Sequence, residues 1–377
     1  MPGIYVHIPF CKQKCFYCDF YKTLETDKRE DFVSALLREL EMRKTYLDPA
    51  QNIETLYFGG GTPSVLSITE LRRIIKAIKS NFSFVANPEI TLEVNPDDIT
   101  DAFLKSIKKE GVNRLSIGIQ SFSDNILSML NRRHNAKQSL RSVEMAREAG
   151  FDNISVDLIY GIPGLSAENW KKELETVFKL DVEHISAYHL TIEKNTVFGK
   201  MKDLGELDEI PEEVSEEQFA ILTQTARDKG YVHYEISNIS KEAYISRHNS
   251  NYWKQVSYLG LGPSAHSFNG YSREWNIADL DTYIQRVTEG EAFSEKEELD
   301  ERIRYNEYVM TSLRTMWGID LNYLETSFSK EMHDYLLNMS ARFMKYGMLT
   351  RNKSGCVILT EQGKMISDNI ISELMMV

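Results

Sequence analysis

Strand-like apolar runs alternate with segments of helical periodicity through the first 240 residues of the chain. The helical spacing is clear after the second run, where Leu71, Ile74, Ile75 and Ile78 fall on one face of a helix. The runs expected to form strands are residues 4–8, 55–58, 90–94, 114–119, 154–160 and 184–190. Strands and helices in series form a parallel sheet with right-handed crossovers. The order therefore predicts a partial (β/α)6 barrel of the TIM type.

Polar or glycine-rich stretches lie where the predicted strands end. Three cysteines follow the first strand, and "GGGTPS" (59–64) follows the second. The polar residues that lie in or close the next three strands are Glu93, Asn95, Gln120 and Asp157. In a parallel barrel the active site lies at the carboxyl ends of the strands. We therefore expect these residues to share one site.

The cysteine triplet Cys11, Cys15 and Cys18 has three possible interpretations. A zinc site would need a fourth ligand, commonly in a second pair of ligands. A redox pair would use Cys15 and Cys18 and leave Cys11 idle. A cubane iron–sulfur cluster could bind all three thiolates and keep its fourth iron open for another ligand. The cluster uses every member of the triplet. The remaining cysteine, Cys356, lies in an apolar run and is expected to be a buried free thiol.

Composition limits where the chain acts. Its 377 residues carry a net charge of −12, which argues against nucleic acid as a partner, because such binding depends on neutralising phosphates. No apolar run reaches membrane-spanning length, and the first residues do not resemble a signal peptide. With so few cysteines, a disulfide scaffold is not expected. We expect a cytoplasmic protein with reduced thiols, which visits a membrane at most transiently.

Two features near the expected site also have structural interpretations. The glycines of "GGGTPS" let backbone approach a ligand closely, but they also suit a tight turn. Glu93 lies in an apolar strand, where a carboxylate needs a partner. That partner could be a hydroxyl or amine of a ligand, or one of the arginines Arg114 and Arg132.

The triplet spacing C-x-x-x-C-x-x-C after a first strand, with the glycine-rich turn, resembles the radical S-adenosylmethionine (SAM) superfamily. The motifs "YVHIPFC", "YFGGGTPS", "LEVNP", "RLSIGIQSF", "NRRH" and "DLIYGIPG" are similar to those of the oxygen-independent coproporphyrinogen III oxidases and their relatives. This resemblance covers nearly the whole chain. It implies a [4Fe-4S] cluster on Cys11, Cys15 and Cys18, with SAM on the open iron. The SAM contacts that it implies are Tyr5, Tyr17, Gly60, Gly61, Thr62, Glu93, Gln120, Arg132 and Asp157.

Two departures point to a sister group, the HemW-type haem chaperones. The oxidases carry a further cysteine where this chain has Phe20, and they have a long segment before the first strand. In addition, "HNSNYW" (248–253) matches the H-N-x-x-Y-W signature of the sister group. The resemblance thus implies a protein that binds haem and delivers it to an unidentified acceptor, with a reductant serving the cluster. The alternative is an enzyme that oxidatively decarboxylates coproporphyrinogen III. No catalytic residue is assigned.

His248 is the expected haem ligand, because a neutral imidazole is a common axial ligand of haem iron. Arg247 could then meet a propionate, and Tyr252 and Trp253 could pack on the ring. The structural alternative is a packed loop in which the histidine holds the backbone. His189 and His266 are the other candidate ligands.

The predicted division of the chain is a barrel over residues 1–240, a connecting region with the H-N-x-x-Y-W motif over 241–298, and a C-terminal domain over 299–377. An acidic run at 203–217 is expected to be solvated. Helical patterns followed by a hairpin within 346–363 predict a winged-helix-like C-terminal domain. Basic and acidic residues nearly balance there, which favours a lid or a partner-docking surface over a DNA-binding one.

Overall fold

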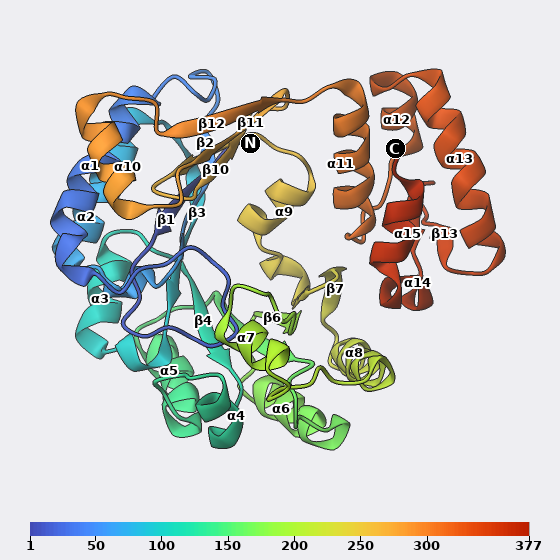
Figure 1. Cartoon of the computed structure of the whole chain (residues 1–377), viewed down its shortest axis with the longest axis horizontal. Coiled ribbons are helices and arrows are strands. Elements are labelled where there is room, and N and C mark those ends of the chain that lie inside the picture. The colour runs from blue at the N-terminus through green and yellow to red at the C-terminus, as the bar shows by residue number, and fades with distance from the viewer. Residues whose placement is uncertain (377) are drawn as a thin grey trace.

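The computed structural model describes residues 1–376 and is built on a twelve-stranded sheet, shown in Figure 1. Its strand order is β12-β11-β10-β9-β1-β2-β3-β4-β5-β6-β8-β7. The central parallel strands are β1 (Gly3–Ile8), β2 (Ile53–Gly60), β3 (Phe84–Val94), β4 (Arg114–Gln120), β5 (Ile154–Tyr160) and β6 (His184–His189). These are the six predicted strands. The barrel is partial, since β6 pairs with antiparallel β8 instead of returning to β1.

Helices cover the outer face of the parallel strands (Figure 1). They are α1 (Arg29–Met42), α2 (Ile68–Asn81), α3 (Asp101–Lys109), α4 (Asp124–Met129), α5 (Ala136–Glu148) and α6 (Ala167–Lys179). In α2 the four apolar residues predicted to share a face are all buried, and Ser67 and Glu70 form a capping box at its N-terminus. Single-turn 3-10 helices lie at Thr26–Lys28, Pro63–Val65, Pro96–Asp98 and Glu242–Tyr244.

The alternation of side chains along the strands separates core from site. In β1, Ile4, Val6 and Ile8 are fully buried in the main hydrophobic core, whereas Tyr5 and His7 line cavities on the other face. The inner face is polar in the same way on β3 and β5, where Glu93 and Asp157 line a cavity. The fold therefore presents titratable side chains to the interior of the barrel.

Both edges of the parallel sheet are extended by short strands. At one edge, β9 (Tyr258–Leu261) pairs in parallel with β1, and antiparallel β10 (His266–Phe268), β11 (Ser272–Asn276) and β12 (Ser294–Glu298) follow. At the other edge lie β8 (Asn238–Ser240) and β7 (Val232–Glu235). The connecting helices are α7 (Val197–Asp203), α8 (Glu212–Asp228), α9 (Arg247–Trp253) and α10 (Leu280–Glu289).

The sequence analysis treated residues 241–298 as a connection and did not foresee four strands there. Those strands are only three to five residues long, and β12 reads SEKEE, without apolar alternation. The acidic run is mostly exposed, as expected, but its second half forms the start of α8. Acidic residues suit that position, because a helix N-terminus carries partial positive charge.

The C-terminal part has its own cluster of buried residues, centred on Tyr305, Val309, Leu324, Leu336 and Ile370. It consists of α11 (Glu301–Leu313), α12 (Leu321–Ser327), α13 (Lys330–Lys345), β13 (Leu349–Arg351), β14 (Val357–Leu359), α14 (Glu361–Met365) and α15 (Ser367–Leu374). Strands β13 and β14 form the predicted hairpin. Figure 1 shows this part beside the barrel, with α11 nearest to it. The predicted domain boundaries stay a prediction.

Over residues 1–376, no helix has the length and apolar character needed to span a bilayer.

Candidate functional site

The three cysteines of the triplet line one cavity of about 460 Å³ at the carboxyl ends of the strands, here called the thiol cavity. The Cys11 sulfur lies 3.4 Å from the Thr62 hydroxyl, and Arg132 Nη1 donates to the Cys15 sulfur over 3.3 Å. Among residues 1–376, no three His, Cys, Asp or Glu side chains are grouped to hold a single metal ion. Cysteine side chains that line one cavity without meeting at a point suit a cubane, in which each cysteine binds a different iron.

The loop that carries the cysteines is fixed by side chains from a distant segment. Gln13 Nε2 donates to the Asn131 carbonyl and to Asn131 Oδ1, both over 2.9 Å, and Asn131 Nδ2 returns a bond to the Lys14 carbonyl over 2.8 Å. Asn131 adopts a positive φ of 58°, which brings its side chain and backbone to the same loop. The sequence analysis missed Gln13 and Asn131, because nothing in their residue types marks them.

Salt bridges to Asp98 also hold the cysteine loop in place. The Lys12 ammonium and the Arg133 guanidinium both reach Asp98 Oδ1, at 2.6 Å and 3.1 Å. Burial opposes ionisation of Asp98, but these cations and the Ser64 hydroxyl outweigh burial and lower its pKa. The cysteine loop is therefore held in place before any ligand binds.

Most of the residues implied as SAM contacts line the thiol cavity. Those that do are Tyr17, Gly60, Gly61, Thr62, Glu93, Gln120, Arg132 and Asp157. Tyr5 lines two neighbouring cavities instead, and its hydroxyl lies 3.1 Å from His7 Nδ1. The expectation of one shared site at the strand ends is met by residues from β2, β3, β4 and β5.

The glycine-rich turn is needed first for chain packing. A Cβ added at Gly61 would lie 2.8 Å from the Phe10 carbonyl oxygen, and one at Gly60 would lie 2.7 Å from the His7 ring. Gly60 also has a φ of 105°, a conformation that side chains disfavour. The end of β2 can therefore pass close to the start of the cysteine loop. Nearby, Gln120 adopts a positive φ of 68°, the kind of backbone strain that gathers at functional sites.

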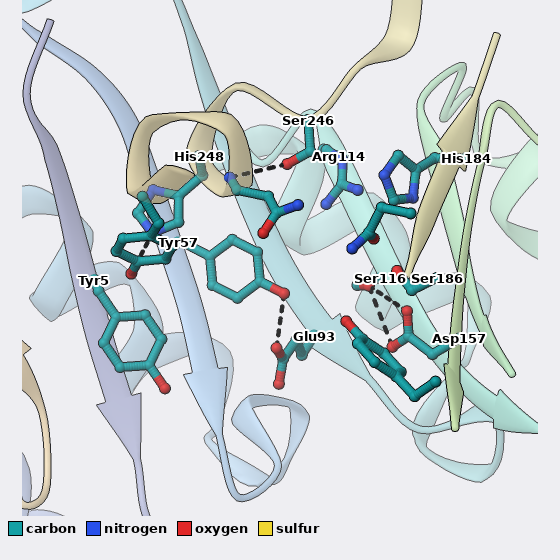
Figure 2. Close-up of a pocket in the computed structure, with 14 residues that line it drawn as sticks. Tyr5, Tyr57, Glu93, Arg114, Ser116, Asp157, His184, Ser186, Ser246 and His248 are labelled. Atoms are coloured by element: carbon teal, nitrogen blue, oxygen red, sulfur yellow. Dashed lines mark hydrogen bonds between the residues drawn. The ribbon is translucent and has the colours of Figure 1, made fainter. Parts of the chain in front are cut away.

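Two carboxylic acids deep in the barrel have raised pKa values. Burial raises the pKa of Glu93 to about 7, although Tyr57 donates a bond of 2.7 Å to it. Burial likewise raises the pKa of Asp157 to about 6, against hydrogen bonds from Ser186 and Ser116. Figure 2 shows both acids facing the same interior space. The sequence analysis considered arginines as partners for Glu93 and missed Tyr57.

Such acids can accept hydrogen bonds from a cationic or hydroxyl-bearing ligand. A nearby positive charge would favour their ionised form and lower their pKa values again. Acids poised in this way inside a cavity are typical of functional sites.

His248 lies at the opposite end of the barrel from the thiol cavity. Its helix α9 crosses the N-terminal ends of β1 and β2, and Figure 2 shows it on the side away from the strand arrowheads. His248 Nδ1 lies 2.7 Å from the Thr55 hydroxyl, and Nε2 lies 2.9 Å from the Tyr252 hydroxyl. The side chain is buried, and burial lowers its pKa to about 3. Both ring nitrogens are therefore engaged within the protein.

The same helix is held at its start by a buried acid. Glu89 accepts bonds from the backbone N–H groups of Arg247 and His248, over 3.0 Å and 2.9 Å. We call this end, with α9, Thr55, Glu89, His248 and Tyr252, the barrel floor. Its geometry corresponds to the structural alternative for His248, in which the histidine holds the backbone.

The two alternative histidines lie elsewhere. His189 lines the thiol cavity with much of its surface exposed to solvent, and partial desolvation there lowers its pKa. His266 is exposed and lines a different cavity, beside β10.

Cys356 lies at the hairpin of the C-terminal part and is partly exposed, so the expectation of a buried thiol was wrong.

Comparison with known proteins agrees with this arrangement. The family model described as the radical SAM superfamily matches residues 5–177. The curated heme chaperone HemW of Bacillus subtilis is 33% identical over 374 residues, covering 98% of each chain. HemW of Escherichia coli is 35% identical over 266 residues, covering 70% of this chain and 69% of the relative.

Among solved structures, the radical SAM enzyme coproporphyrinogen III oxidase (HemN) of Escherichia coli superposes with a TM-score of 0.85 at 25% identity. The superposition covers 99% of this chain and 90% of the oxidase. The likeness therefore extends through the C-terminal part as well as the barrel.

Proposed function

The chain belongs to the HemW family of radical SAM proteins, and from this membership we propose that it binds haem and transfers it to an acceptor protein. The observation that carries the proposal is the match to a heme chaperone along 98% of both chains. Phe20 and the "HNSNYW" motif support the same assignment, because they separate the chain from the oxidases it resembles. The proposal requires a haem-accepting protein and a reductant for the cluster.

We propose that Cys11, Cys15 and Cys18 hold a [4Fe-4S] cluster. The fit rests on three thiols that line one cavity and on the 3.3 Å bond that Arg132 donates to the Cys15 sulfur. When cluster and SAM are bound, together they can supply radical chemistry.

We propose that SAM occupies the remainder of the thiol cavity. Glu93 and Asp157 would accept hydrogen bonds from its polar groups, while the Gly60–Gly61 backbone allows close approach. Gln120 and Arg132 complete the wall on the β4 side. Tyr5, although implied by the resemblance, lines the adjoining cavities and would reach SAM only at their boundary.

The second candidate function is oxidative decarboxylation of coproporphyrinogen III. It is favoured by the superposition on the Escherichia coli oxidase and by a thiol cavity that retains the expected SAM residues. The two functions share the cluster, so loss of the cluster does not distinguish them.

One sample can decide between them. The protein is reconstituted with iron and sulfide without oxygen, and is then titrated with haem while its absorption spectrum is recorded. The same preparation is incubated with SAM, a reductant and coproporphyrinogen III, and the products are separated. We expect a stoichiometric Soret band and no protoporphyrinogen. Repeated turnover to protoporphyrinogen without haem binding would contradict the proposal and support the oxidase.

That His248 binds the haem iron stays a prediction. Its burial on the barrel floor and its two hydrogen bonds mean that coordination would require the loss of at least one of them. Losing a bond to a buried polar group costs about 1–3 kcal/mol.

A further inference from the structure

A cavity of about 420 Å³ lies between the strand extension β9–β11, helix α9 and helix α11 of the C-terminal part. Seven of its fourteen lining residues are phenylalanine, tyrosine or tryptophan. We call it the aromatic crevice, and these residues are Tyr5, Phe20, Tyr21, Tyr252, Trp253, Tyr258 and Phe268. Its size falls within the range of small-molecule sites in proteins.

The aromatic side chains offer apolar surface to a ligand. Tyr258 packs edge-on against Tyr252 with ring centroids 4.6 Å apart, and also lies near Phe268. Phe20 stands at the rim on the cysteine loop and is 72% exposed. Phe20 and the aromatic lining together form a contiguous apolar surface of the kind that lines ligand-binding grooves. A flat aromatic ligand would bury Phe20 and the rings inside the crevice together.

His266 supplies a free imidazole to this crevice. Within residues 1–376 no hydrogen bond reaches either of its ring nitrogens, and the ring stacks on Trp275 with centroids 6.2 Å apart. Partial desolvation and the nearby Arg273 lower its pKa, which favours the neutral ring. The neutral form is the one that binds a metal.

The other candidate ligands in the crevice are engaged or unsuited. His7 is buried, with Nδ1 near the Tyr5 hydroxyl and Nε2 near the Tyr21 carbonyl oxygen. Burial raises the pKa of Tyr21 to about 12, and burial also raises the pKa of Tyr258, so neither forms the phenolate readily. His266 is thus the group in the crevice that is prepared to bind iron.

An adjoining cavity of about 350 Å³ shares Trp253, Phe268 and Glu307 with the crevice. Its acidic lining residues are engaged, because Glu307 pairs with Arg273 over 2.7 Å and Asp320 caps α12. Lys254 and Arg304 also line this cavity, and in the described part of the chain neither has a carboxylate partner. The Lys254 ammonium lies 4.0 Å from the centre of the Trp317 ring. Cations without partners beside an apolar crevice favour a ligand that carries carboxylates.

We propose that the aromatic crevice is the haem seat, with a ring nitrogen of His266 as the axial ligand of the iron and the propionates directed toward Lys254 and Arg304. The step is coordination only: the nitrogen lone pair forms a dative bond to iron, and no electron or proton is transferred. This inference rests on the proposed function. It assigns His248 to holding the barrel floor and not to the iron.

The test compares single variants of the full-length chain, titrated with haem. In His266→Ala we expect a shifted Soret band, altered spin state by electron paramagnetic resonance, and affinity weakened about tenfold or more. Added imidazole should restore the wild-type spectrum, because it can replace the missing ligand. His248→Ala should keep the wild-type spectrum. His333→Ala, which changes a partly buried histidine of the C-terminal part, serves as the matched control.

Two further measurements separate ligation from folding. Protoporphyrin IX, which lacks iron, should bind wild type and His266→Ala equally. Haem dimethyl ester, with blocked carboxylates, should bind wild type more weakly than haem does. The double variant Lys254→Gln, Arg304→Gln should bind haem and its dimethyl ester with equal affinity.

The outcomes distinguish the two proposals. A His266→Ala spectrum that superimposes on that of wild type, together with a changed His248→Ala spectrum, overturns the haem seat and leaves the proposed function standing. A wild-type protein that binds no haem at all overturns the proposed function, and the inference with it.

Discussion

The two ends of the barrel use the same kinds of side chain in opposite ways. At the barrel floor, His248 has both ring nitrogens hydrogen-bonded, and Glu89 accepts bonds from two backbone N–H groups. At the thiol cavity, Glu93 keeps only part of its bonding capacity within the protein, and burial raises its pKa to about 7. The polar groups of the floor are hydrogen-bonded within the protein, whereas Glu93 in the thiol cavity has bonding capacity left for a ligand.

This difference separates structural from functional polar residues. A buried polar group that is fully bonded contributes to holding elements together, and a ligand would have to displace its partner. In a buried acid with a raised pKa, the ionised form is disfavoured until a ligand supplies a hydrogen bond or a positive charge. The predictions that follow set variants at the cavity against variants at the floor.

The largest effect is expected from the cysteine triplet. The triple variant Cys11→Ala, Cys15→Ala, Cys18→Ala should lose all visible charge-transfer absorption and bound iron after reconstitution, because no thiolate is left in the cavity. Cys356→Ala, which changes the one thiol outside the cavity, should keep both. A full cluster in the triple variant would show that the thiol cavity is not the cluster site.

Glu93→Gln should weaken SAM binding by about tenfold or more, because a charged acceptor becomes neutral. Calorimetric titration of the reconstituted, oxygen-free protein measures it, with the surface variant Glu41→Gln as control. Equal affinity in wild type and Glu93→Gln would remove Glu93 from the SAM site.

The same variant should be more stable than wild type when no SAM is present. The Glu93 pKa in the folded chain is about 7, above that of an unfolded glutamate. Between about pH 4.3 and 7 the unfolded chain has therefore released a proton that the folded chain retains, and wild-type stability falls as pH rises through this window. Denaturant unfolding measures the difference in the free energy of unfolding between Glu93→Gln and wild type. This difference should favour the variant by up to about 3 kcal/mol more at pH 8 than at pH 4. A difference that is constant with pH would contradict the raised pKa.

The sequence predicted the strands and the cavity because both follow from local signals. Alternating apolar runs fix the strands, and in a parallel barrel every residue at a carboxyl end reaches the same mouth. Glu93, Gln120 and Asp157 were placed together by that rule alone, and the structure brings them to the thiol cavity.

Residues whose role depends on a distant partner were not predictable in this way. Asn131 fixes the cysteine loop through Gln13 and Lys14, more than a hundred residues earlier in the chain. His248 was expected to bind haem iron because a neutral imidazole is a common axial ligand, and the sequence did not show the hydrogen bonds that its ring makes to Thr55 and Tyr252. The strands β10 and β12 were missed because they are short and pair only through the tertiary fold.

A smaller effect is expected at the floor from Glu89→Ala. The variant leaves two backbone N–H groups at the start of α9 without their acceptor, a loss comparable to that of a helix cap, so unfolding should become easier by about 1–2 kcal/mol. Denaturant unfolding measures it. Cluster content and SAM affinity should not change, because the thiol cavity lies at the other end of the barrel. A loss of SAM affinity as large as that of Glu93→Gln would end the distinction between floor and cavity.

The smallest effect is expected from removing single hydroxyl partners of His248. Tyr252→Phe and Thr55→Val each remove one hydroxyl and leave one ring nitrogen of His248 buried without a partner. Each should reduce the free energy of unfolding by about 1 kcal/mol, the lower end of the cost of a buried polar group left unpaired, and by less for Tyr252→Phe, where water can reach the partly buried bond. Because both bonds end on one imidazole, the double variant should differ from the sum of the single variants, as coupled neighbours do. Haem titration of Thr55→Val adds the decisive control, because Thr55 does not line the aromatic crevice whereas Tyr252 does. If His248 only holds the floor, freeing its Nδ1 in Thr55→Val leaves the Soret band where it is. A band that moves in Thr55→Val, as the imidazole becomes free to bind iron, would make the floor a ligand site.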